Sequence, residues 1–195
     1  QNFFDDQSDT ILETLRSSGY KVAYRVLNSK YFGVAQSRPR LFIIGVRNDL
    51  GLAPSFPTKD LSAPIYTLED AIGDINNNIK DVEAAMIDPK YEVLKWVDML
   101  KPGESGDKYH PNGSYFSLKR IEWDKPCPTI LQSHGRPGFA CGAIHPDENR
   151  PLTIPELKRV HSLPEDFILT GDFIPIPKAL EYFTEGVSED IKKMK

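Results

Sequence analysis

Three side chains that could bind an oxygen-rich group occupy alternate positions just before an apolar run. Gln36, Arg38 and Arg40 are followed at once by Leu-Phe-Ile-Ile-Gly-Val at 41–46. On an extended segment such residues share one face, and the apolar run predicts a strand that is buried on both sides. Guanidinium groups at the mouth of such a strand favour an anion or the oxygen edge of a base. The alternative interpretation is a solvated basic start to an ordinary strand.

A second segment, at 150–167, carries the signals of a short capped helix. Thr153 and Glu156 have the spacing of a capping box, and Pro155 stands in the first turn, where its missing N–H costs nothing. Pro164 marks the predicted end of the helix. The expected apolar stripe of this helix comprises Leu157, Val160 and His161.

The elements that would position the first site are a helix and two strands. Residues 10–18 start with a Thr-x-x-Glu capping box and stop at Gly19. Strands are predicted at 20–27 and 41–46. The order helix, strand, strand indicates the edge of an α/β sheet whose parallel strands are missing from this sequence.

The middle of the chain is predicted to be rich in loops, because many of the 16 prolines lie between 51 and 117. Only two helices stand out there, at 68–72 and 91–100. A short apolar strand at 129–131 then runs into a glycine-rich loop at 133–142, which permits a close approach of the backbone to another molecule.

Composition excludes several classes of protein. The 195 residues carry a formal net charge of −4, which argues against a generally basic DNA-coating protein. Residues 29–47 nevertheless contain four cations and no carboxylate, and 115–145 is basic again, whereas 48–99 is acidic. No apolar run could span a membrane, and two cysteines predict a reducing cytoplasm. The four histidines and two cysteines show no close ligand pairing, so a metal site is not expected.

Together the two segments resemble the eighth and ninth conserved blocks of the DNA cytosine-5 methyltransferases. The first reads as Gln-x-Arg-x-Arg, and the second as Arg-x-Leu-Thr-x-x-Glu followed by Leu-Pro-x-x-Phe. Residues 120–130, Arg-Ile-Glu-Trp-Asp-Lys-Pro-Cys-Pro-Thr-Ile, and His145-Pro146 also fit the family in order and spacing. The resemblance implies an enzyme of the restriction-modification kind that methylates double-stranded DNA and acts in the prokaryotic cytoplasm, on the nucleoid.

Other motifs of that family do not occur in this sequence. They are the glycine-containing loop for S-adenosylmethionine, the Pro-Cys-Gln nucleophile, the Glu-Asn-Val general acid and the closing Gly-Asn-Ser/Ala-Val block. Cys127 lies in Pro-Cys-Pro and Cys141 in a glycine-rich loop, so neither is expected to be the nucleophile. The expectation is a C-terminal part that is inactive alone. Its partner would be the N-terminal catalytic portion of the same enzyme, or a subunit carrying it, which would bind most of the cofactor.

The resemblance also implies roles for the first three residues. Methyltransferases flip the target base out of the duplex. In the family, the second arginine of Gln-x-Arg-x-Arg lies against the cytosine O2 and the catalytic carboxylate, and here that residue is Arg40. Arg38 would support this polar cluster and Gln36 would hold the loop, as preorganised donors in a site emptied of water.

The implied fold is α/β, the edge of a Rossmann-like methyltransferase sheet joined to a small, loop-rich mixed α+β target recognition domain. Residues 1–49 would be the sheet edge and 50–148 the recognition domain. The capped helix at 149–175 would return to the catalytic or hinge region, and 176–195 would be a tail without an assigned role.

Within the recognition domain, the threonine of the Thr129-Ile130 dipeptide would contact the DNA backbone near the flipped nucleotide. Arginine and glutamine can read guanine and adenine through paired bonds. The residues expected to contact DNA are Thr129, Gln132, Ser133, His134, Arg136, Lys119 and Arg120. A glycine-rich hairpin with solvated polar groups is the structural alternative.

Three other functions stay open at this point. One is a stand-alone DNA-binding or regulatory module without catalysis. Another is an RNA cytosine methyltransferase of the same fold. A sugar- or nucleotide-binding α/β protein has only composition in its favour.

Overall fold

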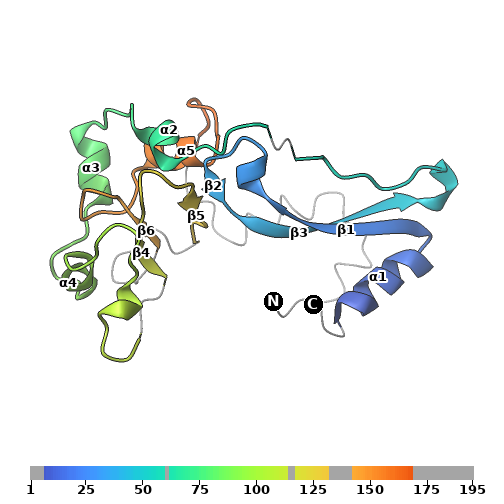
Figure 1. The fold of residues 1–195 in the computed structure, drawn as a ribbon, viewed down its shortest axis with the longest axis horizontal. Coiled ribbons are helices and arrows are strands. Elements are labelled where there is room, and N and C mark those ends of the chain that lie inside the picture. The colour runs from blue at the N-terminus through green and yellow to red at the C-terminus, as the bar shows by residue number, and fades with distance from the viewer. Residues whose placement is uncertain (1–6, 60–61, 114–116, 132–141, 169–195) are drawn as a thin grey trace, which may run out of the picture. The chain divides into compact units, whose positions relative to one another are not determined.

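The computed structural model describes residues 7–59, 62–113, 117–131 and 142–168 (Figure 1). Residues 1–165 form one compact unit and 166–195 a second, of which only the first three residues are described. The helices are α1 (Gln7–Ser17), α2 (Leu68–Ile72), α3 (Ile79–Ala85), α4 (Val93–Val97) and α5 (Ile154–Val160). The strands are β1 (Tyr20–Asn28), β2 (Gln36–Ser37), β3 (Pro39–Arg47), β4 (Leu118–Arg120), β5 (Cys127–Pro128) and β6 (Gly142–Ile144).

The N-terminal elements are a helix and a long β-hairpin. β1 and β3 pair antiparallel along nine residues each, from Tyr20↔Arg47 to Asn28↔Pro39, and α1 packs against β1. Gly19 has a φ of +89° and donates its N–H to Arg16, which confirms it as the end of the helix. The helix begins at Gln7, however, so the predicted capping box at its start is wrong.

The hairpin is less buried than its sequence predicts. Phe42 is 48% exposed on β3, and Tyr24 and Val26 of β1 are 48% and 52% exposed. Within the described residues β3 pairs only with β1, so the expected burial on both sides is not met. Because directly opposed residues point to the same face, Tyr24 and Val26 share one face and Phe42 lies on the other.

The rest of the described chain contains two short parallel pairings. β2 pairs with β5 through Gln36↔Cys127 and Ser37↔Pro128, and β4 pairs with β6 through three residues. The predicted strand at 129–131 is therefore displaced to Cys127–Pro128. Residues 129–131 follow this pairing without strand structure.

The predicted helices of the middle region are partly confirmed. α2 has the predicted bounds, and α4 occupies the centre of the predicted 91–100. Sequence reasoning missed α3, although it has a local signal: Asn78 accepts from the backbone N–H of Asp81 as its N-cap. Among the described residues, the helices are all too short to cross a membrane.

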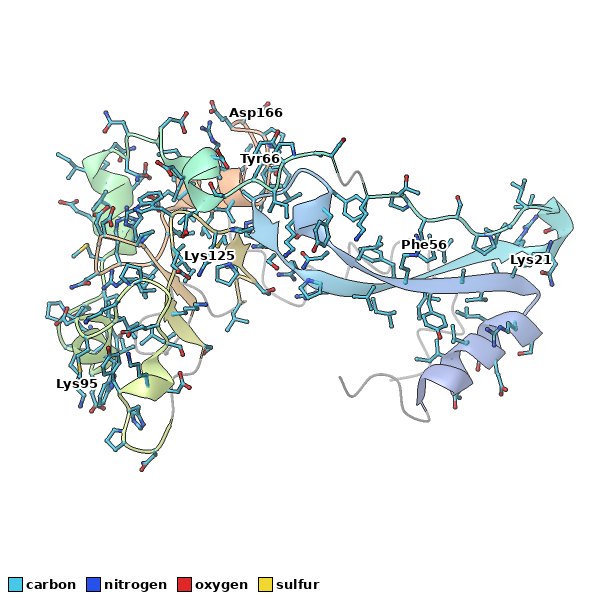
Figure 2. The ribbon with its side chains drawn as sticks, viewed as in Figure 1. Lys21, Phe56, Tyr66, Lys95, Lys125 and Asp166 are labelled. Atoms are coloured by element: carbon cyan, nitrogen blue, oxygen red, sulfur yellow. The ribbon has the colours of Figure 1, made fainter. Side chains whose placement is uncertain are left out.

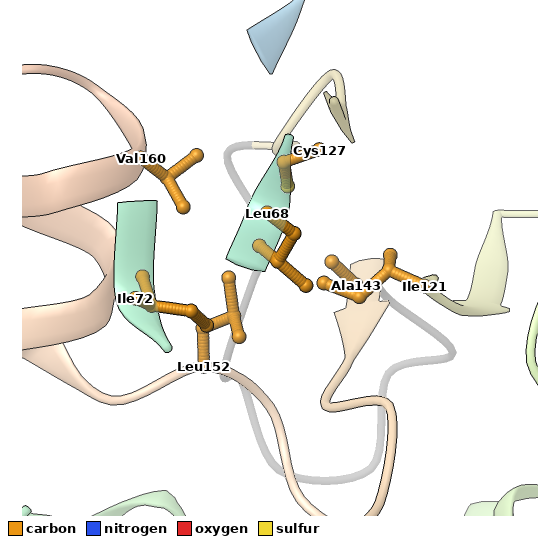
Figure 3. Packing of buried hydrophobic residues seen from close by; sticks show 7 residues of the cluster. All are labelled: Leu68, Ile72, Ile121, Cys127, Ala143, Leu152 and Val160. Atoms are coloured by element: carbon orange, nitrogen blue, oxygen red, sulfur yellow. The ribbon is translucent and has the colours of Figure 1, made fainter. Parts of the chain in front are cut away.

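Two apolar clusters hold the region that follows the hairpin. The first joins α2, the β5 strand and α5, and consists of Leu68, Ile72, Ile121, Cys127, Ala143, Leu152 and Val160 (Figure 3). The second surrounds α4 and consists of Val93, Trp96, Val97, Leu100, Leu118 and Ile144. Strand β6 contributes to both clusters, with Ala143 in the first and Ile144 in the second, and β4 contributes Leu118 to the second. The two clusters therefore meet at β6.

Candidate functional site

Gln36 is fixed in the interior by a contact with the end of α5. Its side chain is 1% exposed, and its Nε2 lies 3.3 Å from Nε2 of His161. The other ring nitrogen, Nδ1, lies 2.8 Å from the carbonyl oxygen of Leu157. A carbonyl can only accept, so we assign the proton of the neutral ring to Nδ1. His161 Nε2 is then an acceptor for the Gln36 amide.

Arg38 and its neighbours connect the Gln-x-Arg-x-Arg segment to the segment after β5. Nη1 of Arg38 lies 3.4 Å from the carbonyl oxygen of Ile130, and Thr129 donates its hydroxyl to the carbonyl of Ser37 at 3.3 Å. The backbone N–H of Arg38 donates to Oδ1 of Asn28 at 3.0 Å. Two segments that are more than ninety residues apart in sequence are thus held side by side.

Arg40 lies exposed on β3, where its Nη1 donates to the carbonyl of Pro39 at 2.7 Å. The spacing predicted one extended segment, but the structure divides it. Gln36 pairs with β5, Arg40 pairs with Leu27 of β1, and Arg38 belongs to neither strand. The backbone thus changes its pairing partner, from β5 to β1, at Arg38. Pro39, the next residue, has no N–H and so cannot donate a hydrogen bond to a neighbouring strand.

The capping box of α5 is confirmed and forms part of a buried ionic cluster. Arg150 donates to both carboxylate oxygens of Glu156 at 2.9 Å, and the backbone N–H of Thr153 donates to the same carboxylate at 2.8 Å. Asn77 donates to Glu156 and accepts from the Thr153 hydroxyl. Burial alone would raise the pKa of Glu156, but these hydrogen bonds and the Arg150 charge hold it below its ordinary value.

The end of α5 differs from the prediction. The helix stops at Val160, and Ser162 adopts a left-handed φ of +55°. This turn precedes Pro164, so the proline is not what ends the helix. Arg159 then connects α5 to α2, because its Nε donates to the carbonyl of Ala71 at 3.0 Å and it pairs with Asp74.

Arg120 corrects one of the predicted DNA contacts. The residue is 5% exposed, and its guanidinium donates to the carbonyls of Leu100, Val97, His145 and Glu148 at 2.8–3.0 Å. It also contacts the Asn149 side chain. A guanidinium whose donors are all used inside the protein cannot hold a phosphate. The local run of cations suggested DNA binding, but Arg120 is a core residue.

The remaining predicted DNA-binding residues have different outcomes. Lys119 is half-buried on β4, and Thr129 lies beside Ser37 as described. Four fall outside the described residues, together with Cys141: Gln132, Ser133, His134 and Arg136.

Cys127 is a core residue on β5. Its side chain is buried in the first apolar cluster, and burial raises the pKa of the thiol to about 12. Since the thiolate is the nucleophilic form, this environment agrees with its rejection as a nucleophile. No group of three potential metal ligands occurs among the residues that the structure describes.

Sequence reasoning missed His161 as a site residue and assigned it to an apolar stripe. Its position four residues after Leu157 explains its local bond, but its contact with Gln36 spans 125 residues of sequence. The separation leaves no local signal. Only the shared fold of the two conserved segments brings them together.

The fold and the paired segments define the class to which the chain belongs. It is a member of the C-5 cytosine-specific DNA methylase family, whose family model matches residues 4–176. A solved structure described as a DNA modification methyltransferase encoded within an E. coli prophage has a similar mixed α/β fold. Its TM-score is 0.52 at 17% identity, over 82% of this chain and 55% of that one.

Similar curated proteins are type II methyltransferases. M.Sau96I of Staphylococcus aureus is 32% identical, over 84% of this chain and 40% of its own length. M.MthTI of Methanothermobacter thermautotrophicus is 30% identical, over 89% of this chain and 58% of its length. M.DdeI of Desulfomicrobium norvegicum is 28% identical, over 84% of this chain and 49% of its own length. The chain thus spans about half the length of these relatives.

The described pockets do not fit S-adenosylmethionine, the cofactor that this family uses. Its sulfonium and ribose hydroxyls call for free carboxylates, whereas the pocket beside β1 is lined by Arg25 and Lys59. In the two pockets near α5, the carboxylates are already engaged: Asp70 by Thr67, Asp74 and Glu165 by Arg159, and Asp81 by Asn78. We therefore assign no cofactor-binding residue in the described part of the chain.

Proposed function

We propose that this chain is the C-terminal part of a DNA cytosine-5 methyltransferase that recognises duplex DNA and helps to hold the flipped cytosine. One observation carries the proposal. Gln36 and Arg38, from one conserved segment, bond to His161 after α5 and to Ile130 after β5. The loop that ends at Arg40 is thereby anchored to the second segment of the family resemblance and to the Thr129-Ile130 dipeptide, whose threonine is expected to contact the DNA backbone.

In this proposal Arg40 acts on the substrate, while Gln36 and Arg38 are positioning residues. Arg40 is exposed, and within the described part of the chain its guanidinium donates only to the neighbouring carbonyl of Pro39. In this proposal its charge therefore serves the cytosine O2 and a catalytic carboxylate. Fixed donors of this kind stabilise developing charge without reorganising during the reaction. The buried amide of Gln36 holds the loop from which Arg40 projects.

The proposed domain assignment places 1–49 at the edge of the catalytic sheet, 50–148 in the target recognition domain and 149–175 in the returning segment. Exposed apolar side chains support the first part. Tyr24, Val26 and Phe42 are each about half exposed on the hairpin, although a β-rich run such as 41–46 normally lies within a covered sheet. A catalytic portion packed on one face of the hairpin would cover the apolar side chains of that face.

Methyl transfer from tritiated S-adenosylmethionine tests the proposal. The 195-residue chain alone should bind duplex DNA and transfer no label, because the family's thiol nucleophile is absent from its sequence. The chain joined to a catalytic portion should label duplex DNA.

Arg40→Ala should slow this joined enzyme by about 3 kcal/mol in activation free energy, the usual effect of losing one preorganised donor. Duplex affinity should stay within a few-fold, since backbone contacts hold the DNA.

Several results would contradict the proposal. Label in tRNA instead of duplex DNA would favour the RNA methyltransferase. Duplex binding without activity in any joined enzyme would favour the stand-alone DNA-binding module. An Arg40→Ala enzyme with an unchanged single-turnover rate would make this residue an ordinary charge at the start of a strand.

A further inference from the structure

A cationic pocket lies on the hairpin, near the end of β1. It has a volume of about 230 Å³. Its lining comes from β1, from the turn after it and from the segment that follows β3: Arg25, Val26, Leu27, Asn28, Tyr31, Phe32, Pro57 and Lys59. Figure 2 labels Phe56, which lies alongside the hairpin where this segment passes. Among the described residues, this lining contains two cations and no carboxylate.

Aromatic rings, not carboxylates, hold the cations of this pocket. The guanidinium carbon of Arg25 lies 5.2 Å from the centroid of Phe56. The ammonium groups of Lys59 and Lys30 each lie 5.0 Å from the centroid of Tyr31. Cation–π contacts orient a cation but leave its full charge in place. These side chains are therefore positioned without being neutralised.

Most other cations that contact a group in the described chain are paired with carboxylates. Ion pairs occupy Arg47, Lys90, Lys95, Lys108, Lys125, Arg150 and Arg159. Among the described residues, by contrast, no carboxylate lies within ion-pair distance of Arg25, Lys30 or Lys59. The sequence from 29 to 47, which contains Lys30 and Tyr31, also lacks any carboxylate. Within the described residues, these cations thus form a local positive charge that no carboxylate pairs, on a chain of net charge −4, and such a charge favours an anionic ligand.

We propose that this pocket binds a phosphodiester group of the DNA backbone, through Arg25 and Lys59. A guanidinium suits two phosphate oxygens at once, and a lysine supplies a mobile point charge beside it. The contact carries no sequence information. It would give the hairpin a contact with the DNA backbone that is separate from the contacts of the Gln-x-Arg-x-Arg segment. This inference rests on the proposed function, since it takes DNA as the ligand.

The test is the salt dependence of binding to a random-sequence duplex, measured by fluorescence anisotropy with the 195-residue chain. Each lost phosphate contact lowers the slope of log K against log [salt] by about 0.9. Arg25→Gln and Lys59→Gln should each lower it by about that amount, and the double variant by about twice as much. Lys59→Arg, which keeps the charge, should retain the original slope.

Lys21→Gln is the matched control. Lys21 is exposed on the same strand, at the end where β1 begins (Figure 2), and its replacement removes the same charge. It should leave the slope unchanged. Thermal melting shows whether each variant is folded, and Lys59→Gln is the safer variant because its side chain is exposed and lies in a segment without regular structure.

Three results would overturn the inference alone. They are unchanged slopes in folded Arg25→Gln and Lys59→Gln chains, an equal loss in Lys21→Gln, and loss of inorganic phosphate binding without a change in the duplex slope. The last result would mark a free-phosphate site. An unmodified chain that binds no duplex at all would overturn the proposed function as well, so the two failures are distinguishable.

Discussion

Arg120 shows at the scale of one residue how neighbouring cations can have opposite uses. It stands beside Lys119 in a basic stretch, and the two residues look equally suited to DNA. Along β4, however, successive side chains point to opposite faces. Arg120 enters the core and donates to four backbone carbonyls, whereas Lys119 stays half-buried.

Replacing Arg120 should therefore affect stability. Arg120→Met removes the guanidinium donor from the carbonyls of Leu100, His145 and Glu148, whereas the Val97 carbonyl keeps the N–H of Leu100. An unsatisfied buried polar group costs about 1–3 kcal/mol. We expect the free energy of unfolding to fall by about 4 kcal/mol, as when buried networks are broken. Lys119→Met should change it by only about 0.5 kcal/mol. Urea denaturation measures the free energy of unfolding of both variants. Equal small losses would mean that the guanidinium of Arg120 is not needed in the core, and Arg120 would again be a candidate DNA contact.

At the scale of elements, success depended on how local the signal was. The capping box of α5 was predictable because Thr153 and Glu156 are three residues apart and sit directly before an apolar stripe. The same spacing at Thr10 led to a wrong helix start. Residues 7–9 are helical too, so Thr10 lies inside α1 and does not cap it. α3 was missed because its Asn78 cap is followed by little apolar pattern; none of its residues is buried.

The contacts that build the candidate site could not be read from the sequence. The short β2–β5 pairing joins Gln36 to Cys127, and the Gln36 amide reaches His161 across 125 residues. Two-residue strands have too few positions to show a periodicity of two. The family resemblance brought the right segments together, but their hydrogen bonds had to come from the structure.

The α5 cap should make stability depend on acid. The pKa of Glu156 is lower folded than its unfolded value of 4.5, because Arg150 and Thr153 bind the carboxylate. Its contribution is therefore fully present above that unfolded value and is lost as the pH falls through the lower, folded pKa. Glu156→Gln should cost about 3 kcal/mol at neutral pH, since Arg150 loses a buried partner, and the difference from the unmodified chain should shrink in acid.

Unfolding in urea at neutral and acidic pH measures this difference. The matched control is Glu92→Gln, which removes a carboxylate from an exposed ion pair with Lys95 on the surface of the chain. Such pairs contribute at most about 1 kcal/mol. A Glu156→Gln penalty that stays constant down to acidic pH would show that the cap does not depend on the carboxylate charge.

At the scale of the whole molecule, burial is unevenly distributed. The region from α2 to α5 has two apolar clusters with fully buried members, such as Leu68 and Val97. The hairpin has apolar side chains on both faces and leaves Tyr24, Val26 and Phe42 about half exposed. Because exposed apolar side chains mark interaction surfaces, either face of the hairpin could receive the proposed catalytic portion, and Phe42 tests one of them.

Phe42→Asp should therefore have an effect that depends on context. In the isolated chain the ring is 48% exposed, so the free energy of unfolding should fall by only about 1 kcal/mol. In the enzyme that includes a catalytic portion, the same change would bury a carboxylate next to its cross-strand neighbour Arg25. Because both charges would lose water there, the loss should still reach about 3 kcal/mol. Ile79→Asp, at a residue 75% exposed on α3, is the control and should cost little in both proteins.

Urea denaturation of the two proteins and their variants decides the question. If Phe42→Asp costs the same in both, the hairpin face stays open in the enzyme and the catalytic portion packs elsewhere.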